Sequence, residues 1–394
     1  MKSNKNLKVL FVASYYPPEH TGAGLRSHRT FKRIKERYPV DILVLSKNRK
    51  NKTDYFEEYE GQPILRVWTG NSLLKCIYNI RRVYYKYNLN SYDIVYCGGD
   101  VYIHIAAALL ARVYSQNIVM EVVKNKSEER NNIIEKIKYI VNFIRFGYIR
   151  VKLQQRSNLL IALNKHIKRY YKKIGVSEDR IWTRPNPVDT RIFNFPTPEQ
   201  REYVRRIYGI YKNQYVHLMV GGIKARKNQK FVVDYFKKLP SHHVLIIAGP
   251  VENSYYLDDL IKSINENMLL ERVKLLEGFH NNVINLYHTS DVLILPSFAE
   301  GTPNVMLEAL CCGLPVLLNE KLGIDEFIDN GKNGWTLPLD SDKFVFYSRL
   351  CEEKLDKQSV RSKIAKSACE NFNYKILDEL LYNKLIMIHN NSIQ

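Results

Sequence analysis

The sequence has no long hydrophobic run. No apolar stretch among the 394 residues reaches the roughly 18 residues that a membrane-spanning helix needs, and the run over residues 103–111 already contains His104. The apolar run after the N-terminal lysines, Val9–Ala13, is too short for a signal peptide. The sequence therefore predicts a protein that stays in the cytoplasm.

Cysteine is also scarce. The chain has six, and only Cys311 and Cys312 are close together, which provides neither a disulfide framework nor a zinc-ligand spacing. We expect reduced, mostly structural cysteines. Asp340 and Asp342 form an Asp-x-Asp pattern like that of metal-binding transferase sites, but we interpret it as a chance match, and the sequence predicts no metal site.

Positive charge is plentiful and unevenly distributed. The formal net charge is +20, and residues 1–190 carry 35 lysines and arginines against 16 acidic residues, whereas the remaining residues are nearly balanced. The first half is therefore expected to face an anionic partner: nucleic acid, an anionic membrane leaflet or a phosphorylated substrate. The alternative is a lysine-rich composition bias without a partner, although a uniform bias should not end at the midpoint.

Short apolar runs alternate with helical patterns along both halves, which is typical of α/β domains with buried parallel strands. The runs read as strands cover residues 7–14, 40–46, 94–97, 118–123, 215–220, 244–248, 273–276, 292–295 and 315–318. We therefore predict two doubly wound, Rossmann-like domains, with ligands bound beyond the carboxyl ends of the strands.

A proline-rich segment separates the two patterns. Four prolines fall within residues 184–198, and proline disfavours both helix and strand interiors. The predicted division is an N-terminal domain over residues 1–185, a linker over 186–198 and a C-terminal domain over 199–371. A final helix at about 372–390 is expected to pack back on the first domain.

The stretch over residues 291–316 carries the strongest chemical pattern. A strand is followed by a loop with Glu300 and Gly301, and then by a helix that contains Glu308. Free amides at a helix start favour an anion such as a diphosphate, whereas two carboxylates beside it suit neutral sugar and ribose hydroxyls. Each glutamate taken alone has a structural alternative. Glu300 could be a charge that complements the helix dipole, and Glu308 could be a solvated helix residue.

This stretch resembles the nucleotide-sugar motif of glycosyltransferase family 4, whose members are retaining enzymes with the GT-B fold of two Rossmann-like domains facing each other across a cleft. The matching residues, in the family's order and spacing, are Pro296, Ser297, Glu300, Gly301, Pro303, Leu307, Glu308, Ala309, Gly313, Pro315 and Val316. Weaker likenesses are the linker Asn186-Pro187-Val188-Asp189, the turn at Gly249 and the strand end at Gly278.

The resemblance implies a role for each residue of the motif. Glu300 is expected to contact the transferred sugar and Glu308 the ribose hydroxyls. The loop amides around Gly301, Thr302 and Asn304 are expected to bind the diphosphate or the sugar.

A second feature follows the strand at 215–220. In family members, a Gly-Arg pair is followed by a lysine after four intervening residues, and the arginine and the lysine neutralise the diphosphate. Lys227 matches the lysine, but Gly222 stands at the arginine position. Lys224 or Arg226 is a candidate for the missing charge, and the alternative for Arg226 is a solvated basic turn.

The N-terminal domain shows one match and one departure. Gly22 and Gly24 open a helix after the first strand and resemble the loop that faces the donor phosphates. Many relatives carry a histidine after the fourth strand, where this chain has none. Glu121 and Lys124 are the candidates to replace it.

The basic half also suggests a membrane surface. Apolar residues recur at helical spacing over residues 133–148 with basic residues beside them, which is typical either of an interfacial helix or of a helix packed on its own domain. A cationic cluster follows at residues 165–173. Since many family members act on lipid-linked acceptors, the resemblance implies peripheral association with the inner face of the plasma membrane.

Together these patterns predict a retaining, metal-independent glycosyltransferase without a cofactor. Its substrates are expected to be a nucleotide-diphosphate sugar and a glycan or lipid-linked acceptor of bacterial surface polysaccharide synthesis. Lys227 and Glu300 are the predicted catalytic residues. The alternatives are another GT-B enzyme, such as a nucleotide-sugar epimerase or a phosphorylase, and a basic nucleic-acid-binding protein. The sequence contains no nucleic-acid-binding motif, so we predict no nucleic-acid partner.

Overall fold

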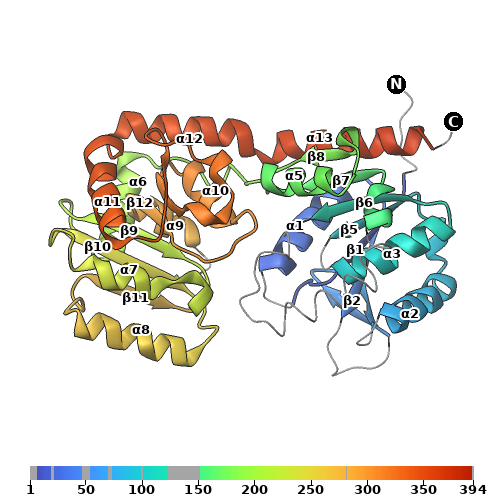
Figure 1. The fold of residues 1–394 in the computed structure, drawn as a ribbon, viewed down its shortest axis with the longest axis horizontal. Helices are drawn as coiled ribbons and strands as arrows, with labels where there is room; N and C mark the ends of the chain where they lie inside the picture. The colour runs from blue at the N-terminus through green and yellow to red at the C-terminus, as the bar shows by residue number, and fades with distance from the viewer. Residues whose placement is uncertain are drawn as a thin grey trace. The chain divides into compact units, whose positions relative to one another are not determined.

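The chain divides into two compact units. The computed structural model describes residues 7–18, 22–46, 54–69, 73–98, 101–122, 151–280 and 282–392. The first unit comprises Met1–Arg184 and Asp378–Gln394, and the second comprises Pro185–Leu377. Each unit is an α/β fold around a largely parallel sheet (Figure 1), as the sequence predicts.

The first unit contains an eight-stranded sheet in the order β3-β4-β2-β1-β5-β6-β7-β8. The strands are β1 (Val9–Ala13), β2 (Val40–Ser46), β3 (Tyr55–Tyr59), β4 (Gln62–Trp68), β5 (Ile94–Gly98), β6 (Asn117–Val122), β7 (Leu159–Ala162) and β8 (Ile181–Thr183). All neighbouring strands pair in parallel except β3 and β4, which are antiparallel. The central strands β1 and β5 are buried throughout, because helices cover both faces of the sheet.

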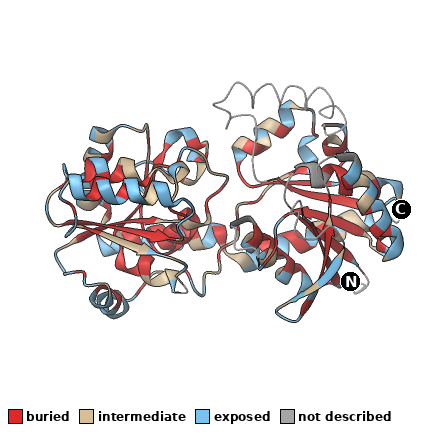
Figure 2. Ribbon diagram, turned by 90° about the horizontal axis from the view of Figure 1, so that it is seen from below, coloured by how far each residue is buried: buried red, intermediate tan, exposed pale blue. Residues whose placement is uncertain are grey.

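Helices of the first unit supply the rest of its core (Figure 2). They are α1 (Gly22–Lys35), α2 (Leu73–Lys86), α3 (Val101–Val113) and α5 (Lys165–Lys173), with short 3₁₀ turns η1 (Leu89–Ser91) and η2 (Glu178–Arg180). No helix in the described part of the chain is long and apolar enough to cross a membrane.

The second unit contains a six-stranded parallel sheet in the order β11-β10-β9-β12-β13-β14. Its strands are β9 (Tyr215–Val220), β10 (His243–Gly249), β11 (Val273–Glu277), β12 (Val292–Leu295), β13 (Val316–Asn319) and β14 (Gly334–Leu337). Counted within this unit, the order is 3-2-1-4-5-6, that of a dinucleotide-binding Rossmann sheet. The order reverses between β9 and β12, and ligands bind beyond the strand ends at such a point.

Helices flank this sheet on both sides, and buried clusters line its two faces. They are α6 (Pro198–Ile207), α7 (Gln229–Phe236), α8 (Ser254–Glu266), α9 (Val283–Thr289), α10 (Asn304–Cys311), α11 (Ser341–Leu355) and α12 (Gln358–Phe372). The 3₁₀ turns are η3 (Ala225–Lys227), η4 (Glu320–Leu322) and η5 (Asp325–Phe327). None of the six cysteines forms a disulfide, and five are buried, in agreement with the expectation of structural thiols.

The last helix, α13 (Tyr374–Asn390), begins in the second unit and belongs to the first from Asp378 onward. Within the first unit, Asp378 accepts a 2.7 Å hydrogen bond from the guanidinium of Arg184, and Leu381 and Leu385 are fully buried in the core. The proline-rich residues 186–198 fall in the second unit, where Val188 bridges to Asn373.

Candidate active site in the second unit

The two loops at the reversal point of the second sheet contact each other. One follows β9 and contains η3, and the other runs from the end of β12 to the start of α10. The Phe298 amide donates to the Arg226 carbonyl at 3.0 Å, and the Asn228 side chain donates to the Pro296 carbonyl at 3.3 Å. These bonds fix the η3 turn, with its cationic side chains, against the Glu-Gly loop.

Glu300 forms ion pairs with both cations of η3. Its Oε1 lies 2.7 Å from Nζ of Lys227, and its Oε2 lies 3.3 Å from Nη1 of Arg226. The Glu300 side chain is only 9% exposed and that of Lys227 only 13%. Burial raises the pKa of the Glu300 carboxyl, but the charges of Lys227 and then Arg226 outweigh burial, so its pKa lies below the usual value. The carboxylate is therefore ionised and held between two cations.

Arg226 also donates to the carbonyl of Ala299, next to the glutamate. The guanidinium is thus placed over the Glu-Gly loop, and the alternative of a solvated basic turn does not describe it. Lys224 instead pairs with Glu252, away from Glu300. Of the two candidates for the missing cation, the structure brings Arg226 to the loop.

The glycines at these strand ends make room for the site. A Cβ on Gly221 would lie 3.1 Å from Cε of Lys227, and one on Gly249 would lie 2.1 Å from the Gly221 carbonyl oxygen. The Gly278 amide donates to the Gly249 carbonyl at 3.0 Å. The absence of side chains at Gly221 and Gly249 therefore lets the ends of β9 and β10 approach each other beside Lys227.

At Gly222, the position of the family's arginine, a side chain would have to displace Glu252. A Cβ there would lie 1.9 Å from Oε1 of Glu252. An acidic side chain thus occupies the space beside Gly222 and pairs with Lys224. Glu252 was not identified from the sequence, because it comes from the loop after β10 and matches no motif.

The start of α10 lies directly after the loop. Pro303 is the N-cap residue and makes no side-chain cap, so no side chain at that position covers the first amides of the helix. The Asn186 side chain donates to the Thr302 carbonyl at 2.8 Å, which fixes the loop that carries Gly301. Oδ1 of Asn304 is buried and has no hydrogen-bond partner among the described residues.

Glu308 lies in the interior rather than in solvent. The residue is 6% exposed, and its Oε2 accepts a 2.9 Å hydrogen bond from the hydroxyl of Tyr287 on α9. The alternative of a solvated helix residue is therefore wrong. The tyrosine partner was not predicted, since it lies 21 residues away on another helix.

The candidate residues of the first unit lie at the start of α1 and the end of β6. Gly22 is the first residue of α1, and Gly24 is buried in its first turn. Glu121 is 3% exposed, and its carboxylate binds the guanidinium of Arg26 at 3.0 Å and the hydroxyl of Tyr96 at 2.7 Å. Glu121 is thus a buried, paired carboxylate.

Several predicted features lie outside the described residues. These include Lys124 and the amphipathic segment 133–148. In the cationic segment 165–173, which forms α5, Lys168 and Lys172 both pair with Glu178. In the Asp-x-Asp pattern that we interpret as a chance match, Asp340 caps α11 by accepting from the Lys343 amide, and Asp342 pairs with Lys238.

Comparisons with known proteins agree with this geometry. Residues 200–366, which contain both loops, match the family described as glycosyl transferases group 1. The chain is 26% identical over 313 residues to an Escherichia coli UDP-Gal:alpha-D-GlcNAc-diphosphoundecaprenol alpha-1,3-galactosyltransferase, covering 77% of this chain and 78% of the relative. It is 29% identical over 149 residues to a Mycolicibacterium smegmatis D-inositol 3-phosphate glycosyltransferase, covering 37% of this chain and 34% of the relative.

Solved structures resemble the whole fold. HepE of Anabaena, crystallised with UDP, superposes with a TM-score of 0.78 at 18% identity, covering 97% of this chain and all of that one. WaaG, a glycosyltransferase of lipopolysaccharide biosynthesis, gives a TM-score of 0.66 at 16% identity over 96% of this chain and 99% of that one. The fold is therefore GT-B, as predicted. The likeness to glycosyltransferases is confirmed at the level of group 1, and the assignment to family 4 stays a prediction.

Proposed function

We propose that this chain is a retaining glycosyltransferase of family 4 that moves a sugar from a nucleotide-diphosphate sugar to a glycan or lipid-linked acceptor. The match of residues 200–366 to glycosyl transferases group 1 supports the transferase activity, and the GT-B fold is compatible with it. The observation that carries the proposal is the contact of Lys227 and Arg226 with Glu300 at the reversal point of a Rossmann sheet.

Lys227 and Arg226 are proposed to bind the donor diphosphate. Both cations converge on one small region, and the uncapped amides at the start of α10 lie on the adjoining loop. Cations and helix-start amides together stabilise the negative charge that grows on a leaving diphosphate. When the diphosphate takes over the cations, Glu300 is released to accept hydrogen bonds from sugar hydroxyls.

Glu308 is proposed to hold the ribose hydroxyls. A buried carboxylate accepts hydrogen bonds only, so it selects donors such as hydroxyls. The Tyr287 hydroxyl occupies one lone-pair position of Oε2 and fixes the orientation of the carboxylate. Gly249 and Gly278, at the neighbouring strand ends, are proposed to leave space for the nucleotide.

The proposed chemistry needs neither a protein nucleophile nor a metal. Retention in the family is ascribed to attack from the face that the diphosphate leaves, with the diphosphate taking the acceptor proton. The protein then contributes positioning and charge stabilisation. Two cations at the proposed diphosphate position support metal independence, because they supply the positive charge that this step requires.

The acceptor is proposed to be a lipid-linked saccharide, reached by peripheral binding at the inner membrane face. The Escherichia coli relative is named for a diphosphoundecaprenol acceptor, and the first half of this chain carries most of the excess positive charge. Full-length protein should therefore bind vesicles with anionic lipid more strongly than neutral vesicles at low salt. Equal binding to both would contradict the membrane proposal while leaving the transfer proposal intact.

A thermal-shift screen tests the donor. UDP, GDP, UDP-galactose, UDP-glucose and GDP-mannose are added to the full-length chain without acceptor. A ligand at 100 times its Kd stabilises the fold by about 2.7 kcal/mol through mass action, which raises Tm measurably. We expect either the uridine or the guanosine nucleotides to raise Tm. No change in Tm with any of them would refute donor binding.

A further inference from the structure

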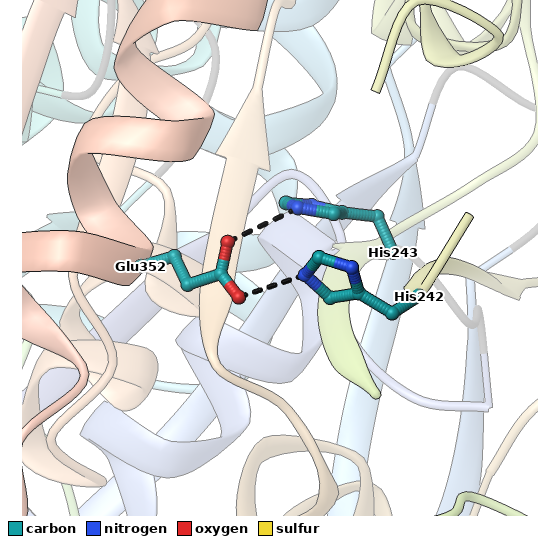
Figure 3. A group of neighbouring side chains, drawn as sticks. All are labelled: His242, His243 and Glu352. Carbon is teal, nitrogen blue, oxygen red and sulfur yellow. Dashed lines mark hydrogen bonds and ion pairs between the residues drawn. The ribbon is translucent and has the colours of Figure 1, made fainter. Parts of the chain in front are cut away.

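Two histidines and a glutamate converge at the end of the second sheet that is opposite the proposed donor loops. His242 and His243 stand at the amino end of β10, and Glu352 extends from α11 (Figure 3). Nε2 of His242 lies 2.9 Å from Oε1 of Glu352, and Nε2 of His243 lies 3.2 Å from Oε2. Among the described residues, this is the one group of three such side chains whose ligand atoms all lie within 4.8 Å.

These spacings are close to those of a tetrahedral zinc site. Ligand atoms about 2.0 Å from a zinc ion at tetrahedral angles are separated by about 3.3 Å. The two nitrogen–oxygen distances, 2.9 and 3.2 Å, fall within a few tenths of that separation. Each of the three side chains offers one ligand atom within 4.8 Å of the others, so a bound cation requires side-chain movements that bring these atoms to the tetrahedral separation.

The buried ring of His243 presents its Nε2 to Glu352. His243 is fully buried, and its Nε2 makes no hydrogen bond of acceptable geometry within the described structure, although Glu352 is only 3.2 Å away. Its other nitrogen, Nδ1, lies 2.8 Å from Nε2 of the buried His217. With Nδ1 of His243 as the donor, its Nε2 keeps a lone pair directed at the cluster. An outer partner of this kind orients metal-binding histidines.

The other two ligands give the site access to solvent. The side chains of His242 and Glu352 are 37% and 34% exposed. An ion can therefore enter from solvent, and water can take the fourth position. Two imidazoles and one carboxylate favour zinc and similar first-row ions over magnesium or calcium, which prefer oxygen ligands.

We propose that His242, His243 and Glu352 form a Zn²⁺ site that fastens α11 to the amino end of β10. The seven residues of β10 separate the cluster from Gly249 by about 20 Å along the strand, so the ion takes no part in transfer. Its expected effect is on the stability of the second unit. The inference does not depend on the proposed function.

Zinc titration of the tag-free full-length chain, stripped with EDTA and measured without nucleotide, tests the site. Wild type is expected to bind one Zn²⁺ per chain by calorimetry and to show a higher Tm with Zn²⁺, but not with Mg²⁺. His242→Asn and Glu352→Gln should bind at least about tenfold more weakly, since loss of an outer-shell partner alone costs that much. Glu353→Gln, an exposed neighbour on the same helix, is the matched control and should behave as wild type.

The outcomes are distinguishable. Equal zinc affinity in wild type and Glu352→Gln, or no zinc-dependent rise in Tm for wild type, would overturn the proposal and leave the cluster a simple ion pair. Far-UV circular dichroism and cooperative unfolding verify that each variant is folded. Transferase activity is assayed separately, so a failed donor screen does not affect the zinc result.

Discussion

The ammonium group of Lys227 lies 2.7 Å from a carboxylate oxygen of Glu300, and this ion pair joins the loops that follow β9 and β12. Arg226 pairs with the other oxygen, so one carboxylate contacts both cations of η3. Under the proposed function, a donor diphosphate would compete with Glu300 for these two cations. Donor binding would then release Glu300 toward the sugar.

Glu300→Gln is expected to separate donor binding from transfer. The amide keeps the size of the side chain but removes the negative charge, so Lys227 and Arg226 become available to a diphosphate. UDP or GDP, whichever stabilises wild type, should bind as tightly as before or more tightly. Transfer should fall at least about 100-fold, because the sugar loses its positioning group. Calorimetry and a product assay measure the two quantities, and near-normal transfer in a folded variant contradicts the role of Glu300.

Lys227→Met is expected to destabilise the second unit at neutral pH. The carboxylate of Glu300 is 9% exposed and would lose its 2.7 Å ion pair, while the longer Arg226 contact at 3.3 Å would remain. Leaving a buried charge poorly compensated costs about 1–3 kcal/mol. Urea unfolding measures this loss. The double variant with Glu300→Gln should recover part of it, since the uncompensated charge is then gone. A double variant no more stable than Lys227→Met would argue against the pairing.

Lys227→Met should also invert the pH dependence of the contribution that the Glu300 carboxylate makes to stability. In wild type the pKa of Glu300 is depressed, so its contribution to stability is present above the unfolded pKa of about 4.5 and is lost as pH falls through the folded pKa. Without Lys227, burial acts with less opposition and moves the pKa upward. The stability difference between wild type and Lys227→Met should therefore be largest near neutral pH and shrink as pH falls toward about 4.5. The stability difference between wild type and Lys224→Met should not shrink in this way, because Lys224 pairs with Glu252.

Two glycine substitutions separate a backbone clash from conformational strain. Gly249 and Gly278 both have positive φ angles, +153° and +96°. A Cβ on Gly249 would meet the Gly221 carbonyl oxygen at 2.1 Å, whereas one on Gly278 would have no atom within 4 Å. Gly278→Ala should therefore cost about 1–3 kcal/mol from strain alone, and Gly249→Ala clearly more. Equal losses in chemical unfolding would mean that the close approach of β10 and the β9 loop is not important for stability.

The sequence predicts the parts of this site that one continuous segment determines. Glu300, Gly301 and the start of α10 follow a buried strand within ten residues, so their order along the chain already places the loop beyond the end of the sheet. Other partners of the site come from distant segments. Glu252 beside Gly222 and Tyr287 beside Glu308 belong to other loops and helices, and no local pattern marks them.

The strands missed in the first unit have a similar explanation. The edge strand β3 is mostly exposed and carries Glu57 and Glu58, so it lacks the continuous apolar run that identified the buried strands. At three residues, β8 is too short to stand out from its surroundings. The buried strands β4 and β7 were also missed, although β7 is as long as the predicted strand β12. Pairing across the sheet, rather than intrinsic preference, makes these segments strands.

Arg226 should replace the cation that is absent at Gly222. Its guanidinium contacts Glu300 and the Ala299 carbonyl, whereas Lys224 is engaged by Glu252. Arg226→Ala is therefore expected to weaken nucleoside-diphosphate binding about tenfold, or about 1.4 kcal/mol. Lys224→Ala removes the same formal charge a few residues away and should change the affinity by less than about twofold, because surface pairs contribute little. Calorimetric titration at two salt concentrations compares the nucleoside-diphosphate affinities of the two variants. If both variants lose affinity equally, the charge acts through the general field of the turn and not through a contact with the diphosphate.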